Sequence, residues 1–167
     1  EFGGKLFDDS HASRVLPGFL PDSKLRMLYN LKDVCEIIIT INANDIENNK
    51  IRGDNETSYD AETIRLKEAF EDYGFLVNGI IITQFDNQPK AVKYQKYLDN
   101  LGIASYKTYD IQGYPNNIDH IISKDGFGRN ERVKTTRPLV VITGPGPGSG
   151  KMATCLSQMY LDHEAGI

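Results

Sequence analysis

The chain lacks several features that would assign a protein to a functional class at once. Its 167 residues include only two cysteines, Cys35 and Cys155, which are too few for a disulfide framework. We therefore expect reduced thiols and a cytoplasmic location. The longest apolar runs, such as Ile37–Ile41, are far too short to span a bilayer. The sequence thus predicts one soluble domain that is long enough to bury a core.

A basic excess is also absent. Lysine and arginine number 19 against 23 acidic residues, which leaves a formal net charge of −4. Nonspecific binding to nucleic acid or to an anionic membrane requires a basic face. We therefore expect neither nucleic acid nor a membrane as a partner, although a local basic pocket remains open.

The common catalytic motifs are missing as well. The sequence contains no nucleophile elbow, no CxxC, no HExxH and no GxGxxG followed by an acidic residue. No reaction is therefore indicated, and whether the protein is an enzyme stays undecided.

What the chain does contain is an alternation of strand and helix patterns, typical of βαβ units. Asn42–Tyr59 is polar and predicts a loop, while Ile111–Asn130 fits either a short strand or a helical turn. We expect a three-layer α/β sandwich with a mostly parallel, Rossmann-like sheet of about five strands. Strands are predicted at 35–41, 77–83, 103–109 and 138–143, and helices at 23–32, 61–73, 89–101 and from 151.

Polar segments follow the predicted strands. In open parallel sheets, ligands bind outside the carboxyl ends of the strands. Asn42, Asn44 and Asp45 come directly after a central strand, and local turn formation explains them equally well. Lys5 and Asp8 are expected to face the same crevice. These five residues are the candidate ligand contacts outside the glycine loop.

The most informative stretch runs from Thr135 to Tyr160. It predicts an apolar strand, a glycine-rich turn over Gly144–Gly150 and a helix that opens at Lys151. Free N–H groups at a helix N-terminus, with a lysine at the lip of the loop, are a common way to hold phosphate. The P-loop pattern G-x-x-x-x-G-K-[ST] matches only in part, because Pro145 and Met152 depart from it and no partner acid for magnesium follows the strands.

We therefore favour an anion-binding turn of its own type over a P-loop, with a plain strand-to-helix turn as the alternative. Pro145 and Pro147 carry no N–H, so the anion is expected over the second half of the loop. Its ligand would be a nucleotide or another phosphorylated metabolite, with or without Mg²⁺. The predicted phosphate-binding residues are Gly148, Ser149, Gly150, Lys151, Met152 and Thr154.

Other polar residues are weaker candidates. Asp8, Asp9 and His11 could form a metal site, although a solvated loop or a helix cap is favoured. His120 and His163 show no metal-ligand spacing and are expected at the surface. Arg137 starts a strand at the opposite sheet edge, where a structural salt bridge is expected.

Three long blocks carry a family resemblance: EFGGKLFDDSHASRVLPGF at 1–19, INANDIENNKIRGD at 41–54 and TTRPLVVITGPGPGSGKMATCLSQMY at 135–160. With these blocks, the chain resembles the bacterial domain-of-unknown-function family eighteen-forty-six, whose members are several hundred residues long. The resemblance implies an N-terminal α/β portion of a longer protein. It implies a missing C-terminal region as a partner, supplies no reaction, and leaves a noncatalytic scaffold role and a homo-oligomer open.

Overall fold

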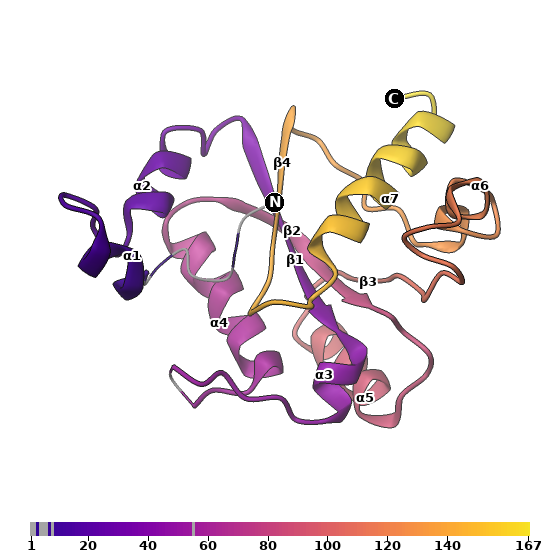
Figure 1. Ribbon diagram of the computed structural model, residues 1–167, viewed down its shortest axis with the longest axis horizontal. Helices are drawn as coiled ribbons and strands as arrows, with labels where there is room; N and C mark the ends of the chain where they lie inside the picture. The colour runs from indigo at the N-terminus through magenta and orange to yellow at the C-terminus, as the bar shows by residue number, and fades with distance from the viewer. Residues whose placement is uncertain (1–2, 4–6, 8, 55) are drawn as a thin grey trace.

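The computed structural model describes residues 3, 7, 9–54 and 56–167. Its centre is a wholly parallel sheet in the order β3-β2-β1-β4 (Figure 1). The α/β class with a parallel sheet is thus confirmed, with four strands instead of about five. The strands are β1 (Cys35–Asn42), β2 (Leu76–Thr83), β3 (Ser105–Lys107) and β4 (Leu139–Thr143).

Helices cover both faces of the sheet, which makes three layers. One face packs against α4 (Tyr59–Asp72) and α5 (Pro89–Asn100), while α7 (Lys151–Glu164) lies on the other. The β-branched run of β1 explains its central place. Ile37, Ile39 and Ile41 point into the larger core, and Ile38 points toward α7.

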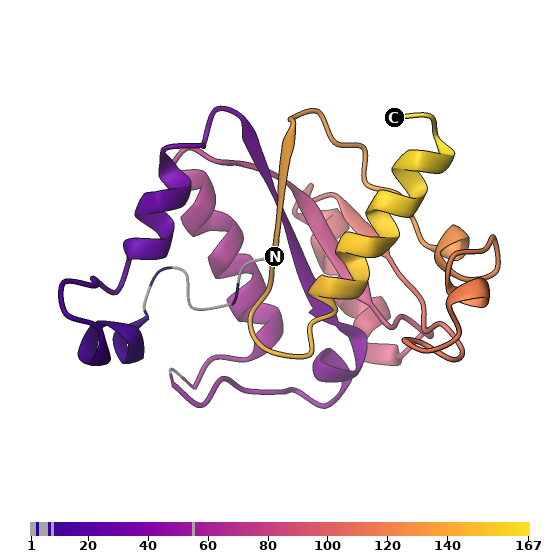
Figure 2. The ribbon, with the colours of Figure 1, turned by 45° about the horizontal axis from the view of Figure 1, so that its top comes forward.

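The remaining elements flank the sheet (Figure 2). The helices α1 (Ser10–Val15) and α2 (Ser23–Tyr29) lie at one side, and Leu25 and Leu28 of α2 enter the larger core. At the other side, the region 111–130 forms the helical turn α6 (Ile118–Ile121) and the 3₁₀ turn η1 (Phe127–Arg129). Ile118 and Ile121 of this ambiguous region are thus helical, and among the described residues no fifth strand joins the sheet.

Three predictions from the sequence differ from the structure. The helix predicted at 23–32 is α2, which ends at Tyr29. The stretch 42–59 contains a short helix, α3 (Ala43–Glu47), because the Asn42 side chain caps it by accepting a hydrogen bond from Asn44 N at 2.8 Å. The strand predicted at 103–109 shrinks to β3, which pairs only with β2 and therefore lies at the sheet edge.

The amino edge of the sheet is held by a buried carboxylate. Glu36, with 0% exposure, accepts hydrogen bonds from Thr136 N at 2.7 Å, Arg137 N at 2.9 Å and Asn78 Nδ2 at 2.8 Å. Arg137 has a structural role here, as expected, but not through a salt bridge. Its guanidinium donates instead to the carbonyl oxygens of Lys32 and Cys35, which face it where β1 begins.

Both cysteines are free of disulfides. Cys35 is fully buried in β1, and this burial raises the pKa of its thiol, so the thiol stays protonated. In the described residues, no helix combines the length and apolar character needed to cross a membrane.

Replacing Glu36 tests the amino-edge contacts. Glu36→Ala should lower the free energy of unfolding by about 3 kcal/mol, because it leaves buried N–H donors without an acceptor. The exposed Glu68→Ala on α4 serves as the control and should change stability by less than about 0.5 kcal/mol. Urea denaturation followed by circular dichroism measures both, and equal effects would contradict this account of Glu36.

Candidate functional site

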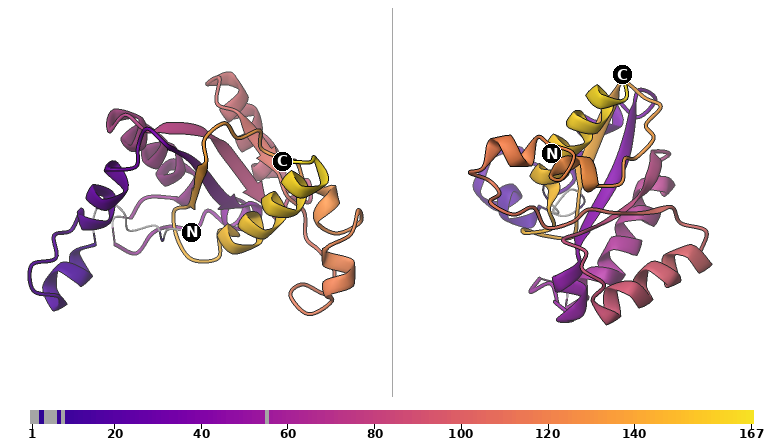
Figure 3. Two further views of the ribbon diagram at one scale, coloured as in Figure 1. Left: turned by 90° about the horizontal axis from the view of Figure 1, so that it is seen from above. Right: turned by 90° about the vertical axis from the view of Figure 1, so that its right-hand side faces the viewer.

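The glycine loop Gly144–Gly150 leaves β4 and lies over the carboxyl ends of the neighbouring strands (Figure 3). Its anchor is Ser149, which is fully buried. The Ser149 hydroxyl lies 3.1 Å from Thr40 Oγ1 of β1, and the Ser149 carbonyl accepts a hydrogen bond from Thr83 Oγ1 of β2 at 3.0 Å. Asn42 Nδ2 adds a hydrogen bond to the Gly148 carbonyl at 3.1 Å. Side chains from two strands thus hold the loop from below.

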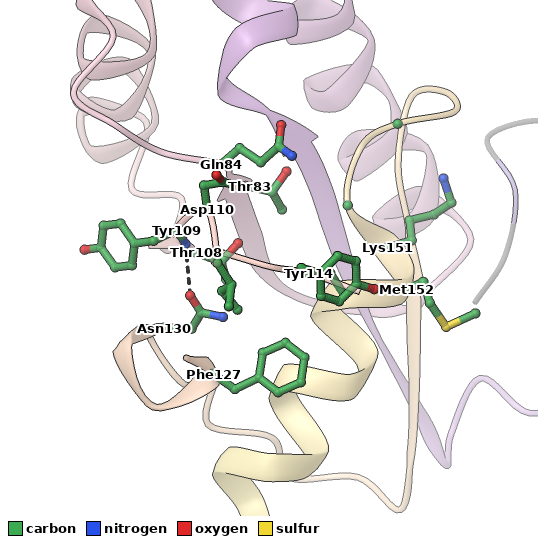
Figure 4. A pocket seen from close by; sticks show the side chains of 14 residues that line it. Thr83, Gln84, Thr108, Tyr109, Asp110, Tyr114, Phe127, Asn130, Lys151 and Met152 are labelled. Atoms are coloured by element: carbon green, nitrogen blue, oxygen red, sulfur yellow. Dashed lines mark hydrogen bonds between the residues drawn. The ribbon is translucent and has the colours of Figure 1, made fainter. Parts of the chain in front are cut away.

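Lys151 also binds Ser149 and helps to hold the loop. The sequence predicted it at the outer edge of the loop, where it would face a ligand. Its side chain is buried, and Nζ donates to the Gly146 carbonyl at 3.0 Å and to Ser149 Oγ at 3.2 Å. Figure 4 shows this side chain turned away from the other labelled residues of the cleft. The folded-back loop brings oxygen acceptors next to the ammonium group, which explains the difference.

Two glycines allow the loop to pack this closely. Gly150 has φ 86°, and a Cβ there would lie 2.8 Å from the Thr83 side chain. A Cβ at Gly146 would lie 2.3 Å from the hydroxyl oxygen of Tyr59, the first residue of α4. Glycine is therefore required at these two positions, because Thr83 and Tyr59 leave no room for a side chain.

The second half of the loop presents unused backbone donors. Within the described part of the chain, the N–H groups of residues 148–153 donate to no protein acceptor, and no side chain caps α7. The helix is 14 residues long, and its dipole adds a partial positive charge at this end. Such a row of donors can hold an anion.

A cleft with a volume of about 340 Å³ opens beside these donors (Figure 4). It lies between the carboxyl ends of β2 and β3 and the start of α7, and Gly148, Gly150, Lys151, Met152 and Ala153 form one wall. The opposite walls combine polar and aromatic side chains. They are Thr83, Gln84, Thr108, Tyr109, Asp110, Ile111, Tyr114, Phe127 and Asn130.

Of the other candidate contacts, Asn42, Asn44 and Asp45 do not line this cleft. Asn42 and Asn44 are bonded to each other and to Gln84, which supports their local role. Asp45 pairs with Lys50 at 3.1 Å. Lys5 and Asp8 lie outside the described residues, so their predicted part in the crevice stays a prediction.

Thr154 and Thr143 have buried side chains whose hydroxyl groups are not satisfied by the described residues. Neither hydroxyl oxygen has a hydrogen-bond partner among the described residues, although both side chains are at most 3% exposed. Thr154 lies one turn into α7, below the free N–H groups. Thr143 shares the face of β4 with Val141, which belongs to the core on the α4 side. The two thus lie on opposite faces of the sheet.

The predicted alternative of a metal site finds no support in the described residues. Asp9 caps α1 by accepting a hydrogen bond from Ala12 N at 3.1 Å, and it pairs with Lys24 at 2.5 Å. The helix-cap interpretation of Asp9 is thus confirmed. Among the residues that the structure describes, no three His, Cys, Asp or Glu side chains gather in a group that could hold a metal.

The sequence did not indicate that Thr40 and Thr83 hold the glycine loop in place. Thr40 and Thr83 lie in apolar strands, where a threonine is typical as one more β-branched residue.

A second hollow, of about 400 Å³, lies on the Tyr59 side of the loop. Its Arg52 already pairs with Asp54 and Glu62, and the hydrogen bonds that Arg52 donates to Asp54 raise the pKa of Arg52. The cleft is therefore the better candidate site.

The contact between Gly146 and Tyr59 can be tested directly. Gly146→Ala should lower the free energy of unfolding by about 2 kcal/mol, because the added methyl group overlaps a buried ring. Gly53→Ala is the matched control, since its Cβ would meet open space at an ordinary φ. Thermal denaturation of both variants is the measurement. An unchanged Gly146→Ala protein would show that the loop does not pack as described.

Comparison with known proteins places the chain in a family. It is 54% identical over all of its 167 residues to a UPF0371 protein of Streptococcus equi subsp. equi, of which it covers 34%. Identity and coverage are the same for the UPF0371 proteins of Streptococcus uberis and Streptococcus sanguinis. The chain therefore spans about a third of the length of these curated relatives. A family model described as "Domain of unknown function DUF1846, N-terminal" matches residues 1–167, and the protein belongs to that family.

Proposed function

We propose that this domain binds a small phosphorylated molecule, a nucleotide or another phosphorylated metabolite, in the cleft beside the glycine loop. One observation carries the proposal. Five of the six consecutive residues whose N–H groups lack a protein acceptor, 148–153, also line the cleft. Donors without partners, a helix dipole and a hollow of ligand size thus coincide at one place.

The position in the sheet supports the same assignment. The loop follows β4 and lies against β1, where the strand order changes direction, since β2 and β3 continue on one side of β1 and β4 lies on the other. Crevices at such points are where doubly wound, Rossmann-like sheets bind nucleotides, and the proposed cleft opens next to this point, at the carboxyl ends of β2 and β3. Two cysteines without disulfides agree with the cytoplasmic location that we propose.

The bonding of the loop also defines how the anion would be held. Because Lys151 donates to Gly146 and Ser149, its ammonium group lies beneath the loop. It would attract the anion electrostatically without contacting it. Backbone N–H groups would make the hydrogen bonds. The hydroxyl of Thr154 is buried, has no described partner and does not line the cleft, so we expect it to act on the ligand only through a bridging water.

A noncatalytic scaffold role is the second candidate, and one observation favours it. The loop packs tightly on Tyr59, Thr40 and Thr83, as a rigid strand-to-helix turn would. Every α-helix leaves its first N–H groups without an intrahelical acceptor, but the N–H groups of Gly148 and Ser149, before the helix, also donate to no described acceptor, and no side chain caps α7. We therefore prefer the binding role.

A matched pair of substitutions at Met152 tests the anion site. The side chain is 57% exposed and lines the cleft, so neither substitution should disturb the core. Met152→Glu places a negative charge beside the anion and should weaken binding at least about tenfold, which corresponds to ~1.4 kcal/mol. Met152→Gln, of similar shape but uncharged, should bind as the parent protein does.

Calorimetry on the full-length protein with ATP, GTP, sugar phosphates and inorganic phosphate is the measurement. If none of these binds the parent protein, the proposed function is wrong. If the glutamate and glutamine variants bind equally well, the anion lies elsewhere.

The two unpartnered threonines supply a second pair. Thr154→Val and Thr143→Val each remove a buried hydroxyl without a described partner, so each should raise the free energy of unfolding by about 1 kcal/mol. Only Thr154→Val should weaken phosphate binding, by about threefold to tenfold. Chemical denaturation and calorimetry on the same preparations separate the two effects, and equal binding by both variants would remove Thr154 from the site.

A further inference from the structure

An exposed apolar surface adjoins the cleft and shares Tyr114 and Met152 with its lining. We name it the α6–α7 face. It runs along one side of α7, where Met152, Leu156 and Met159 follow each other at helical spacing, and continues over α6. Its members are 39–68% exposed: Tyr114, Ile118, Ile122, Met152, Leu156 and Met159.

The α6–α7 face is hollowed. A groove of about 280 Å³ lies between α6 and α7, and its lining is almost wholly apolar side chains, including Ile118, Ile122, Leu156 and Met159. Below it, Ile121 and Phe127 form a small separate core with Tyr160 packed against them. A contiguous apolar hollow on a rigid base is typical of a surface that another segment covers.

We propose that the C-terminal region of the full-length protein fills this groove with apolar side chains and so forms the missing wall of the cleft. The inference does not depend on what the cleft binds. The length of the relatives supports it, because about two-thirds of their chain lies outside the region that this chain matches. The matching family model is described as N-terminal, so in the family a further region follows α7.

The geometry also favours a segment of the same polypeptide. Met159 lies five residues before Glu164, the last residue of α7, which is about 8 Å along the helix. Polypeptide that continues from α7 would therefore start close to the groove and dock at a high effective concentration. A hollow of this size fits a few side chains of one segment, whereas a stable dimer buries about 800 Å² on each partner.

The groove and the cleft share two residues, Tyr114 and Phe127. A segment seated in the groove would therefore contact the same aromatic side chains that line the cleft. The C-terminal region would in this way limit access of water and ligand to the loop. In this proposal, the α6–α7 face is a docking surface that helps to control access to the cleft.

Cysteine labelling of the full-length protein tests the proposal without any ligand. In a Cys155→Ser background, Met159→Cys reports on the groove, and Tyr97→Cys on α5 is the control. Tyr97 is 50% exposed on the other side of the sheet. If the C-terminal region covers the groove, Met159→Cys should react with maleimide about a hundredfold more slowly than Tyr97→Cys. Equal rates in the folded protein would overturn the proposal.

Cross-linking identifies what covers the groove. A photoreactive amino acid at Ile122, in a mixture of ¹⁴N- and ¹⁵N-labelled full-length protein, should link to a peptide beyond Ile167 of the same chain. Links only between differently labelled chains, or protection that vanishes on about a hundredfold dilution, would show a second copy instead and overturn the proposal. Ile118 offers a second position if substitution at Ile122 prevents folding, as judged by thermal denaturation.

Discussion

The candidate site depends on the hydrogen bonds of one buried residue, Ser149. Its hydroxyl meets Thr40 of β1, and its carbonyl accepts a hydrogen bond from Thr83 of β2. Because both strands are parallel and central, their carboxyl ends define a fixed platform. The N–H groups of residues 148–153 then donate to no described protein acceptor, and five of these six residues line the cleft. This anchor therefore helps to fix the start of α7 against the sheet.

The position of Lys151 follows from the same constraint. The first half of the loop contains two prolines and folds back over the sheet, so its carbonyl oxygens need donors. The ammonium group of Lys151 supplies one to Gly146. The domain thus uses its lysine to shape the loop, and the backbone provides the donors for an anion. This division differs from a P-loop, where the lysine contacts the phosphates.

Much of the fold was predictable, because local patterns decided it. The runs of isoleucine in β1 and β2 can be satisfied only by burial on both faces, and the helices α4 and α5 were predicted to within two residues at each end. Predictions failed where the local signal was weak. Asn42 fitted a local turn, and the polar residues after it did not indicate the short helix that it caps; β3 pairs only with β2, over three residues.

The sequence by itself determined that this protein is a parallel α/β domain with a donor-rich glycine turn before a helix, since strand, turn and helix are encoded by residues next to one another. Tertiary structure decided everything that needs distant residues to meet. The contacts of Ser149 join positions 109 and 66 residues apart, and the cleft combines α7 with side chains from β2 and the stretch 108–130. Local sequence patterns cannot predict such pairs, because hydrogen bonds between distant residues depend on how the whole chain folds and not on the adjacent residues.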